Sequence, residues 1–205
     1  MSKQRLSFKT AAIVLLLLCA LGGLVLWSVQ APRAPAGPLA GAQIGGPFTL
    51  IDQDGRTVTE KDFGGRYKLV YFGYTFCPDV CPLDVQKLAT AMRTFEKQDP
   101  ARAAKVVPIF ITVDPERDTT AALKDFVSAF HPRLVGLGGS VAQVDAAKKA
   151  YRVYAKKAGP EGSKDYLVDH TAMIYLMGPD GAPISFTDHT GTADQIAADL
   201  DKYVR

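Results

Sequence analysis

The stretch from Lys68 to Lys87 constrains the fold most, because a buried strand there runs through a two-cysteine turn into a helix. Its first half, Lys68 to Tyr74, is apolar, aromatic and β-branched, which predicts a buried strand. Pro82 suits the first position of a helix, so we predict that the helix begins there. Cys77 and Cys81 then lie at a helix start, where free N–H groups and the helix dipole favour thiolate. A thiolate is both a nucleophile and a soft metal ligand, so redox chemistry and metal binding are both open.

The beginning of the chain has the pattern of a membrane anchor. Residues 11–27 carry no charged or strongly polar side chain, and the apolar run approaches the ~20 residues that cross a bilayer. Lys3, Arg5 and Lys9 precede it, which predicts a cytoplasmic segment 1–9, a single transmembrane helix 10–29 and a domain on the other side of the membrane. A cleaved signal peptide is the alternative, but the apolar run is longer than a usual h-region.

The charge of the remaining chain excludes one class of function. Lys3, Arg5 and Lys9 account for the net charge of +3, because the other basic residues equal the 21 acidic ones in number. Nothing in this balance supports nucleic-acid binding.

Residues 30–46 are rich in Ala, Pro and Gly and predict a linker. Residues 47–205 are enough for one domain.

Strand and helix patterns alternate along this domain. The predicted strands are two short ones within Phe48–Thr59, then Lys68–Tyr74, Val106–Val113, Leu134–Leu137, Thr171–Met177 and Ile184–Phe186. The predicted helices are Pro82–Lys97, a helix capped by Asp114–Thr119 and running to Phe130, Val141–Lys156 with Tyr151 and Tyr154 inward, and Asp194–Tyr203. Lys156–Asp165 is predicted to be a mobile surface loop. This order, with a two-cysteine turn after a central strand, predicts an α/β thioredoxin-like domain.

The cysteines of the turn form the single available pair, because Cys19 lies in the predicted anchor. A disulfide between Cys77 and Cys81 would close only a short loop and would stabilise the fold weakly. A pair this close at a helix start is better suited to redox exchange or to metal binding.

A metal site needs a further ligand, and the chain has three histidines. His131 follows a helix, where a solvated imidazole is expected. His170 and His189 both occur in Asp-His-Thr. His170 directly precedes the strand Thr171–Met177, in a loop that would face the cysteine turn, whereas His189 leads into the last helix, so His170 is preferred. A core histidine that bonds to Asp169 is the structural alternative.

Two thiolates and one imidazole suit copper as low-coordinate Cu(I), with Cu(II) as a second state, while structural zinc usually takes four protein ligands. Asp79 or Asp169 could complete such a tetrahedron. A haem-attachment site is excluded, because Cys-x-x-Cys-His is absent.

Three motifs together resemble the Sco/SenC family of membrane-anchored copper proteins. They are Tyr71–Pro82 (YFGYTFCPDVCP), Thr112–Thr119 (TVDPERDT) and Asp169–Thr171 (DHT). The resemblance covers the domain from about Pro47 to Arg205 and extends to the layout of anchor and linker.

The resemblance implies a metallochaperone that binds copper through Cys77, Cys81 and His170. For this ligand set we predict Asp169 as a partner of the imidazole. It implies a role in assembling the dinuclear copper centre of cytochrome c oxidase. The expected partners are the copper-accepting subunit of that oxidase, a copper donor protein, a thiol reductant and the membrane. The expected location is the bacterial inner membrane, with a single span and the domain in the periplasm.

The alternative function is a thiol–disulfide oxidoreductase that reduces an acceptor's cysteines before copper insertion, with Cys77 and Cys81 as its catalytic pair. A peroxidase of the thioredoxin superfamily rests on fold analogy alone. A run of basic residues could dock an acidic partner, although it more commonly forms the solvated side of a helix. Its members are Lys148, Lys149, Arg152, Lys156 and Lys157.

Overall fold

The computed structural model describes residues 8–30, 36–160, 163 and 165–205, and the chain divides into two compact units, 1–34 and 35–205. In the first unit, helix α1 covers Phe8–Gln30, with side chains described for residues 12–23. Among the described residues, none forms a helix long and apolar enough to cross a membrane. Most of the predicted cytoplasmic segment 1–9, and the side chains at both ends of the predicted span 10–29, lie outside the described residues.

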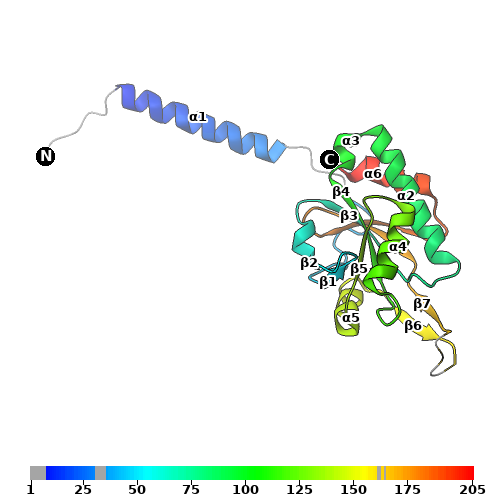
Figure 1. Ribbon diagram of the computed structural model, residues 1–205. Helices are drawn as coiled ribbons and strands as arrows, with labels where there is room; N and C mark the ends of the chain where they lie inside the picture. Colours follow the sequence, from blue (N-terminus) through cyan, green and yellow to red (C-terminus); the bar gives the residue numbers. More distant parts are fainter. Residues whose placement is uncertain (1–7, 31–35, 161–162, 164) are drawn as a thin grey trace. The chain divides into compact units, whose positions relative to one another are not determined.

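The second unit is built on a seven-stranded sheet in the order β2-β1-β5-β4-β3-β8-β9 (Figure 1). The strands are β1 Thr49–Asp52, β2 Thr57–Thr59, β3 Tyr67–Gly73, β4 Val106–Thr112, β5 Val135–Gly138, β8 Met173–Met177 and β9 Pro183–Asp188. β3, β4 and β5 are parallel, whereas β8 pairs antiparallel with both β3 and β9. Every residue of β3 and β4 is buried, as expected for central strands covered on both faces.

Helices cover both faces of this sheet. They are the 3₁₀ helix η1 Glu60–Phe63 and the α-helices α2 Val80–Gln98, α3 Pro100–Ala103, α4 Thr120–Phe130, α5 Val141–Ala150 and α6 Ala193–Tyr203. On one face, the ring of Phe110 in β4 lies 4.9 Å from that of Phe126 in α4. On the other face, the ring of Phe72 in β3 lies 5.2 Å from that of Tyr151, directly after α5. The predicted pattern of strands and helices is confirmed for most of the domain.

The helix predicted over Val141–Lys156 is too long, because α5 ends at Ala150. Arg152 adopts a left-handed φ of +57°, and the next residue, Val153, donates its N–H to the Lys148 carbonyl. This is a common way for a helix to stop. Tyr154, predicted to point inward, is 59% exposed as a consequence.

The predicted surface loop Lys156–Asp165 is largely part of a hairpin. β6 (Ala155–Ala158) pairs antiparallel with β7 (Leu167–His170), and Ala155 lies opposite His170 in the register. Residues 161, 162 and 164 of the predicted loop lie outside the described residues.

The described end of the predicted linker 30–46 contacts the domain. Leu39 donates its N–H to the Ile184 carbonyl at 3.0 Å, and Gly45 donates to the Ala150 carbonyl at 2.9 Å. The side chains of Leu39 and Ile44 pack against the core. Residues 31–35 lie outside the described residues, and the domain boundary at Pro47 stays a prediction.

Candidate functional site

The turn between β3 and α2 carries both cysteines of the domain, and the helix begins earlier than predicted. α2 starts at Val80, so Cys81 lies inside its first turn and Pro82 occupies the third helical position. Cys77 lies before the helix, and its Sγ accepts a hydrogen bond from the Cys81 N–H at 3.4 Å. Both cysteines are free thiols.

Burial separates the two thiols. Cys81 is fully buried in the core, whereas Cys77 is half-buried. Burial raises the pKa of the Cys81 thiol, and the neighbouring Cys77 adds to the rise. The predicted preference for thiolate is therefore wrong for Cys81, because the loss of hydration outweighs the helix start.

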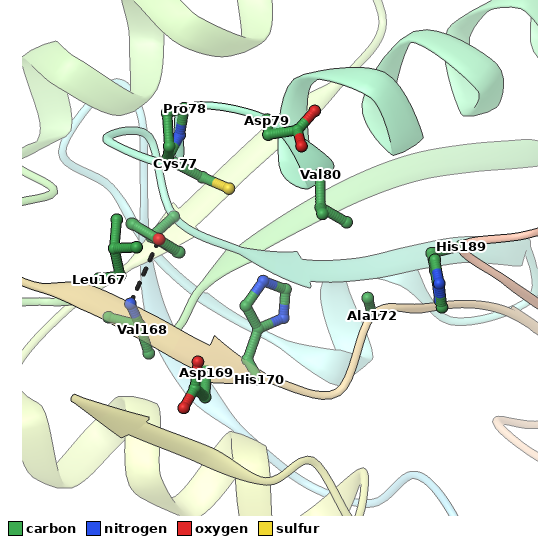
Figure 2. A pocket seen from close by; sticks show the side chains of 11 residues that line it. Cys77, Pro78, Asp79, Val80, Leu167, Val168, Asp169, His170, Ala172 and His189 are labelled. Carbon is green, nitrogen blue, oxygen red and sulfur yellow. Dashed lines mark hydrogen bonds between the residues drawn. The ribbon is translucent and has the colours of Figure 1, made fainter. Parts of the chain in front are cut away.

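His170 ends β7 and points toward the cysteine turn (Figure 2). Its Nε2 lies 3.3 Å from Cys81 Sγ, and its Nδ1 lies 3.1 Å from the Thr171 carbonyl oxygen. A carbonyl can only accept, so Nδ1 carries the proton and Nε2 is an acceptor in the neutral ring. Burial lowers the pKa of His170, which favours this neutral form. Asp169 was predicted to be the hydrogen-bond partner of the imidazole, but the Nδ1 of His170 bonds to the Thr171 carbonyl instead.

Two tyrosines enclose the imidazole of His170. The Tyr71 and Tyr74 rings meet it edge-on, with centroids 6.2 Å and 5.9 Å away. The Tyr74 hydroxyl also accepts the N–H of Val168 in β7, which links this strand to the end of β3 (Figure 2). Burial raises the pKa of Tyr74 to about 12, so its hydroxyl stays protonated at neutral pH.

The other two histidines differ in their surroundings. His131, predicted to be solvated, is 2% exposed, and its Nε2 lies 3.3 Å from Glu96 Oε2. Its Nδ1 accepts the N–H of Arg133, and burial lowers its pKa. The prediction was wrong because the ring is held between Glu96 of α2 and the Arg133 N–H. His189 lies on the wall of the same pocket as His170 (Figure 2).

This pocket, of about 400 Å³, opens beside Cys77 and His170. Asp79 and His189 also line it, and Leu167 adds apolar surface. No three His, Cys, Asp or Glu side chains among the described residues are grouped so that they could hold a metal ion. The structure thus brings Cys81 and His170 into contact and Cys77 alongside them, and their roles as metal ligands stay predictions.

A buried carboxylate beneath the cysteine turn was not predicted. Asp118 is 4% exposed and accepts the Thr75 N–H at 3.0 Å, the Thr75 hydroxyl at 2.7 Å and the Thr112 hydroxyl at 2.6 Å. Burial raises the pKa of Asp118, although these hydrogen bonds act in the opposite direction. Asp118 belongs to the run Asp114–Thr119, which predicts a helix cap and forms part of a motif of the resemblance, but neither interpretation gives its carboxylate a role.

A second unpredicted cluster lies under Phe76, the residue before Cys77. The guanidinium of Arg117 lies 3.6 Å from the Tyr166 ring centroid and 5.1 Å from that of Phe76. Its Nε lies 2.5 Å from Asp114 Oδ2, and the Tyr166 hydroxyl donates to Asp114 Oδ1 at 2.7 Å. Stacking on aromatic rings and pairing with a carboxylate suit a planar guanidinium. This cluster supports one side of the turn.

Comparison with known proteins agrees with the resemblance that the sequence motifs indicate. Residues 36–205 match the SCO1/SenC family. The mitochondrial protein SCO1 homolog 1 of Arabidopsis thaliana is 44% identical over 170 residues, which cover 82% of this chain and 50% of that protein. The chain therefore spans about half the length of this relative.

Two solved structures support the fold. The structure of Bradyrhizobium japonicum ScoI with copper bound has a TM-score of 0.70 and 47% sequence identity, and the match covers 78% of this chain and 99% of that one. BsSco, a Sco-family cytochrome c oxidase assembly protein with an identified disulfide switch, has a TM-score of 0.62 and 27% identity, covering 84% and 96%. The predicted α/β thioredoxin-like fold is confirmed.

Proposed function

Because this chain belongs to the SCO1/SenC family, we propose that it is a copper metallochaperone that carries its cargo on Cys77, Cys81 and His170. The observation that carries the proposal is the 3.3 Å contact between Cys81 Sγ and His170 Nε2, which joins residues 89 positions apart. A similar protein was solved with copper bound. Thiolate sulfurs are soft donors that suit Cu(I), and an imidazole nitrogen binds copper in either state, with Cu(II) as the second state.

The residues around this contact prepare it for a soft cation. The Thr171 carbonyl holds the proton of His170 on Nδ1, so that Nε2 keeps its lone pair toward Cys81. The buried Cys81 thiol keeps its proton until a cation replaces it, since a sulfur ligand must be deprotonated. The proposed acceptor is the subunit of cytochrome c oxidase that holds the dinuclear copper centre, and a copper donor protein and a thiol reductant act before transfer.

Copper content and absorption of the reduced protein after loading test this proposal. We expect one copper per chain in the parent, and loss of tight binding in Cys77→Ser and in His170→Ala. His189→Ala is the matched control, because His189 lines the same pocket and should be dispensable. Copper binding as tight as the parent's in both Cys77→Ser and His170→Ala would refute the ligand set.

A second function is favoured by the proximity of the two free thiols, with the Cys81 N–H bonded to Cys77 Sγ. Cys77 and Cys81 would reduce an acceptor's disulfide. Two electrons and two protons leave this pair as its own disulfide forms, and the acceptor's disulfide becomes two thiols. Reductase activity that survives His170→Ala and is lost in Cys77→Ser would favour this function over copper delivery.

We also propose that residues 10–29 anchor the chain in the bacterial inner membrane, with residues 30–46 as linker and 47–205 in the periplasm. The support is the uncharged run 11–27 preceded by Lys3, Arg5 and Lys9. We expect protease added to intact spheroplasts to digest the domain. We also expect detergent alone to release the chain from membranes. Release by high salt alone contradicts the anchor.

A further inference from the structure

A larger pocket lies at the other end of β3 from the cysteine turn. It has a volume of about 980 Å³ and lies between residues 42–47, η1, the end of α5 and the turn 179–183. Lys68 lines this pocket, whereas Gly73 leads into the cysteine turn. These two residues are about 16 Å apart along the strand at the usual rise per residue. The pocket is therefore separate from the proposed copper site.

Lys68 is an unusual residue for the centre of a sheet. It is 5% exposed, and its strand neighbours in the register are Val107 and Met177. Within the described part of the chain, its ammonium has no hydrogen bond or ion pair, although the charge of Asp180 acts on it. Burial lowers the pKa of Lys68. Its ammonium is not among the fully buried, unpartnered polar atoms of the described residues, so it reaches the space of the pocket. A lysine ammonium that lines a pocket and has no partner in the described chain favours an anion from outside the chain.

Three further cations line the same pocket: Lys61, Lys149 and Arg152. None of them forms an ion pair with a described residue. The Nε of Arg152 donates to the Gln43 carbonyl at 3.2 Å, which lays this side chain along the rim. Arg152 also occupies a left-handed backbone position after α5, where glycine would be unstrained. An arginine there keeps a guanidinium at the pocket.

Two carboxylates line the pocket as well, but each accepts a backbone N–H. Glu60 Oε2 accepts from Phe48 at 3.1 Å, and Asp180 Oδ1 accepts from Ala182 at 3.0 Å. With four basic and two acidic side chains, the lining carries a net charge of +2.

We propose that this pocket binds a phosphate-bearing small molecule, with Lys68 as its buried ion partner and Arg152 at the rim. A phosphate monoester carries up to two negative charges, which matches the charge of the lining. Lysine provides a point charge, and the planar fork of arginine fits phosphate oxygens. The volume is at the upper end of the range for small-molecule sites and leaves room for an organic portion. A soluble phosphate ester and a phospholipid headgroup share this chemistry.

Isothermal titration calorimetry of the full chain distinguishes a soluble phosphate ester from a phospholipid headgroup. One arm uses glycerol 3-phosphate, and the other uses monomeric dihexanoyl phosphatidylglycerol, with dihexanoyl phosphatidylcholine as the zwitterionic control. We expect saturable binding in one arm, weakened about tenfold to a hundredfold in Lys68→Met. Asp180→Asn should strengthen binding, because it removes a negative charge from the lining. Lys97→Met, an exposed lysine of α2 outside the pocket, is the matched control and should bind like the parent.

The outcomes separate this site from the copper site. Binding should be unchanged in Cys77→Ser, so failure of the copper proposal leaves this one standing. Should Lys68→Met not fold by circular dichroism, Arg152→Gln supplies the same test with a rim residue. Absence of saturable binding in both arms, or equal binding by the parent and these variants, overturns the proposal.

Discussion

The hydrogen bonds of Asp118 hold the cysteine turn against the end of β4, and Asp118→Ala removes them together. One carboxylate oxygen accepts the Thr112 hydroxyl at 2.6 Å and the Thr75 N–H at 3.0 Å, and the other accepts the Thr75 hydroxyl at 2.7 Å. Thr112 is fully buried and Thr75 is half-buried. Of the three donors, the Thr75 hydroxyl alone can rotate toward water when Asp118 is removed.

The Thr112 hydroxyl and the Thr75 N–H are then left without acceptors, and each unpaired donor costs about 1–3 kcal/mol. Part of this loss is offset, because burial raises the pKa of Asp118 and its charge is therefore itself unfavourable in the fold. We expect Asp118→Ala to lower the free energy of unfolding by about 3 kcal/mol. Asp118→Asn keeps one acceptor oxygen but turns an amide donor toward the threonines, so a smaller loss of about 1–2 kcal/mol is expected.

Urea unfolding of the reduced protein at pH 7, followed by far-ultraviolet circular dichroism, measures this loss. The midpoint should fall without a change in slope. Asp125→Ala, on the exposed side of α4, is the matched control and should stay within about 0.5 kcal/mol of the parent. Alkylation of Cys81 should also become faster in Asp118→Ala, because the turn that covers it loosens. A loss below about 1 kcal/mol with unchanged alkylation would refute the role of Asp118.

Three further predictions follow from the geometry. A Cβ at Gly73 would lie 2.8 Å from Tyr71 Cε1 and 3.1 Å from Cys81 Sγ, so Gly73→Ala should cost about 1–3 kcal/mol in urea unfolding and weaken copper uptake. Unchanged values of both would contradict these close contacts. Burial lowers the pKa of both His131 and His170, so the folded chain binds fewer protons than the unfolded chain below about pH 6.5. The free energy of unfolding should therefore fall as pH decreases from 7 through these lowered pKa values, by at most about 1.4 kcal/mol per pH unit for each histidine. Urea midpoints that do not change with pH would contradict this. Arg152→Gly should raise the thermal midpoint, because glycine adopts the left-handed backbone position without strain and gains about 0.5–1 kcal/mol of stability. A lower midpoint would show that the contacts of the arginine side chain outweigh this strain.

The elements that the sequence predicted well carry their own local signal. β3 and β4 are continuous apolar runs, and Thr119 caps α4 through its side chain, which accepts the Ala122 N–H. The start of α2 was predicted two residues late, because Pro82 was assigned to the first helical position. The first N–H groups of a helix have no partner within it, so proline is tolerated at the third position as well.

The end of α5 had no such signal. Neither glycine nor proline occurs between Lys149 and Ala158, and the four residues of β6, Ala-Lys-Lys-Ala, have low strand propensity. The helix stops because pairing of β6 with β7 is more favourable than another helical turn. That pairing is a tertiary effect, which local patterns do not contain.

The same pairing determines how His170 meets the cysteines. The sequence placed His170 in a loop facing the turn, whereas it is a strand residue held opposite Ala155, with the Thr171 carbonyl on Nδ1. A ring in a mobile loop would sample many orientations, and a strand residue with one nitrogen bonded to the backbone directs Nε2 to Cys81. Burial then fixes the protons, since it lowers the pKa of His170 and raises that of Cys81. The pair is therefore neutral, with the proton on sulfur.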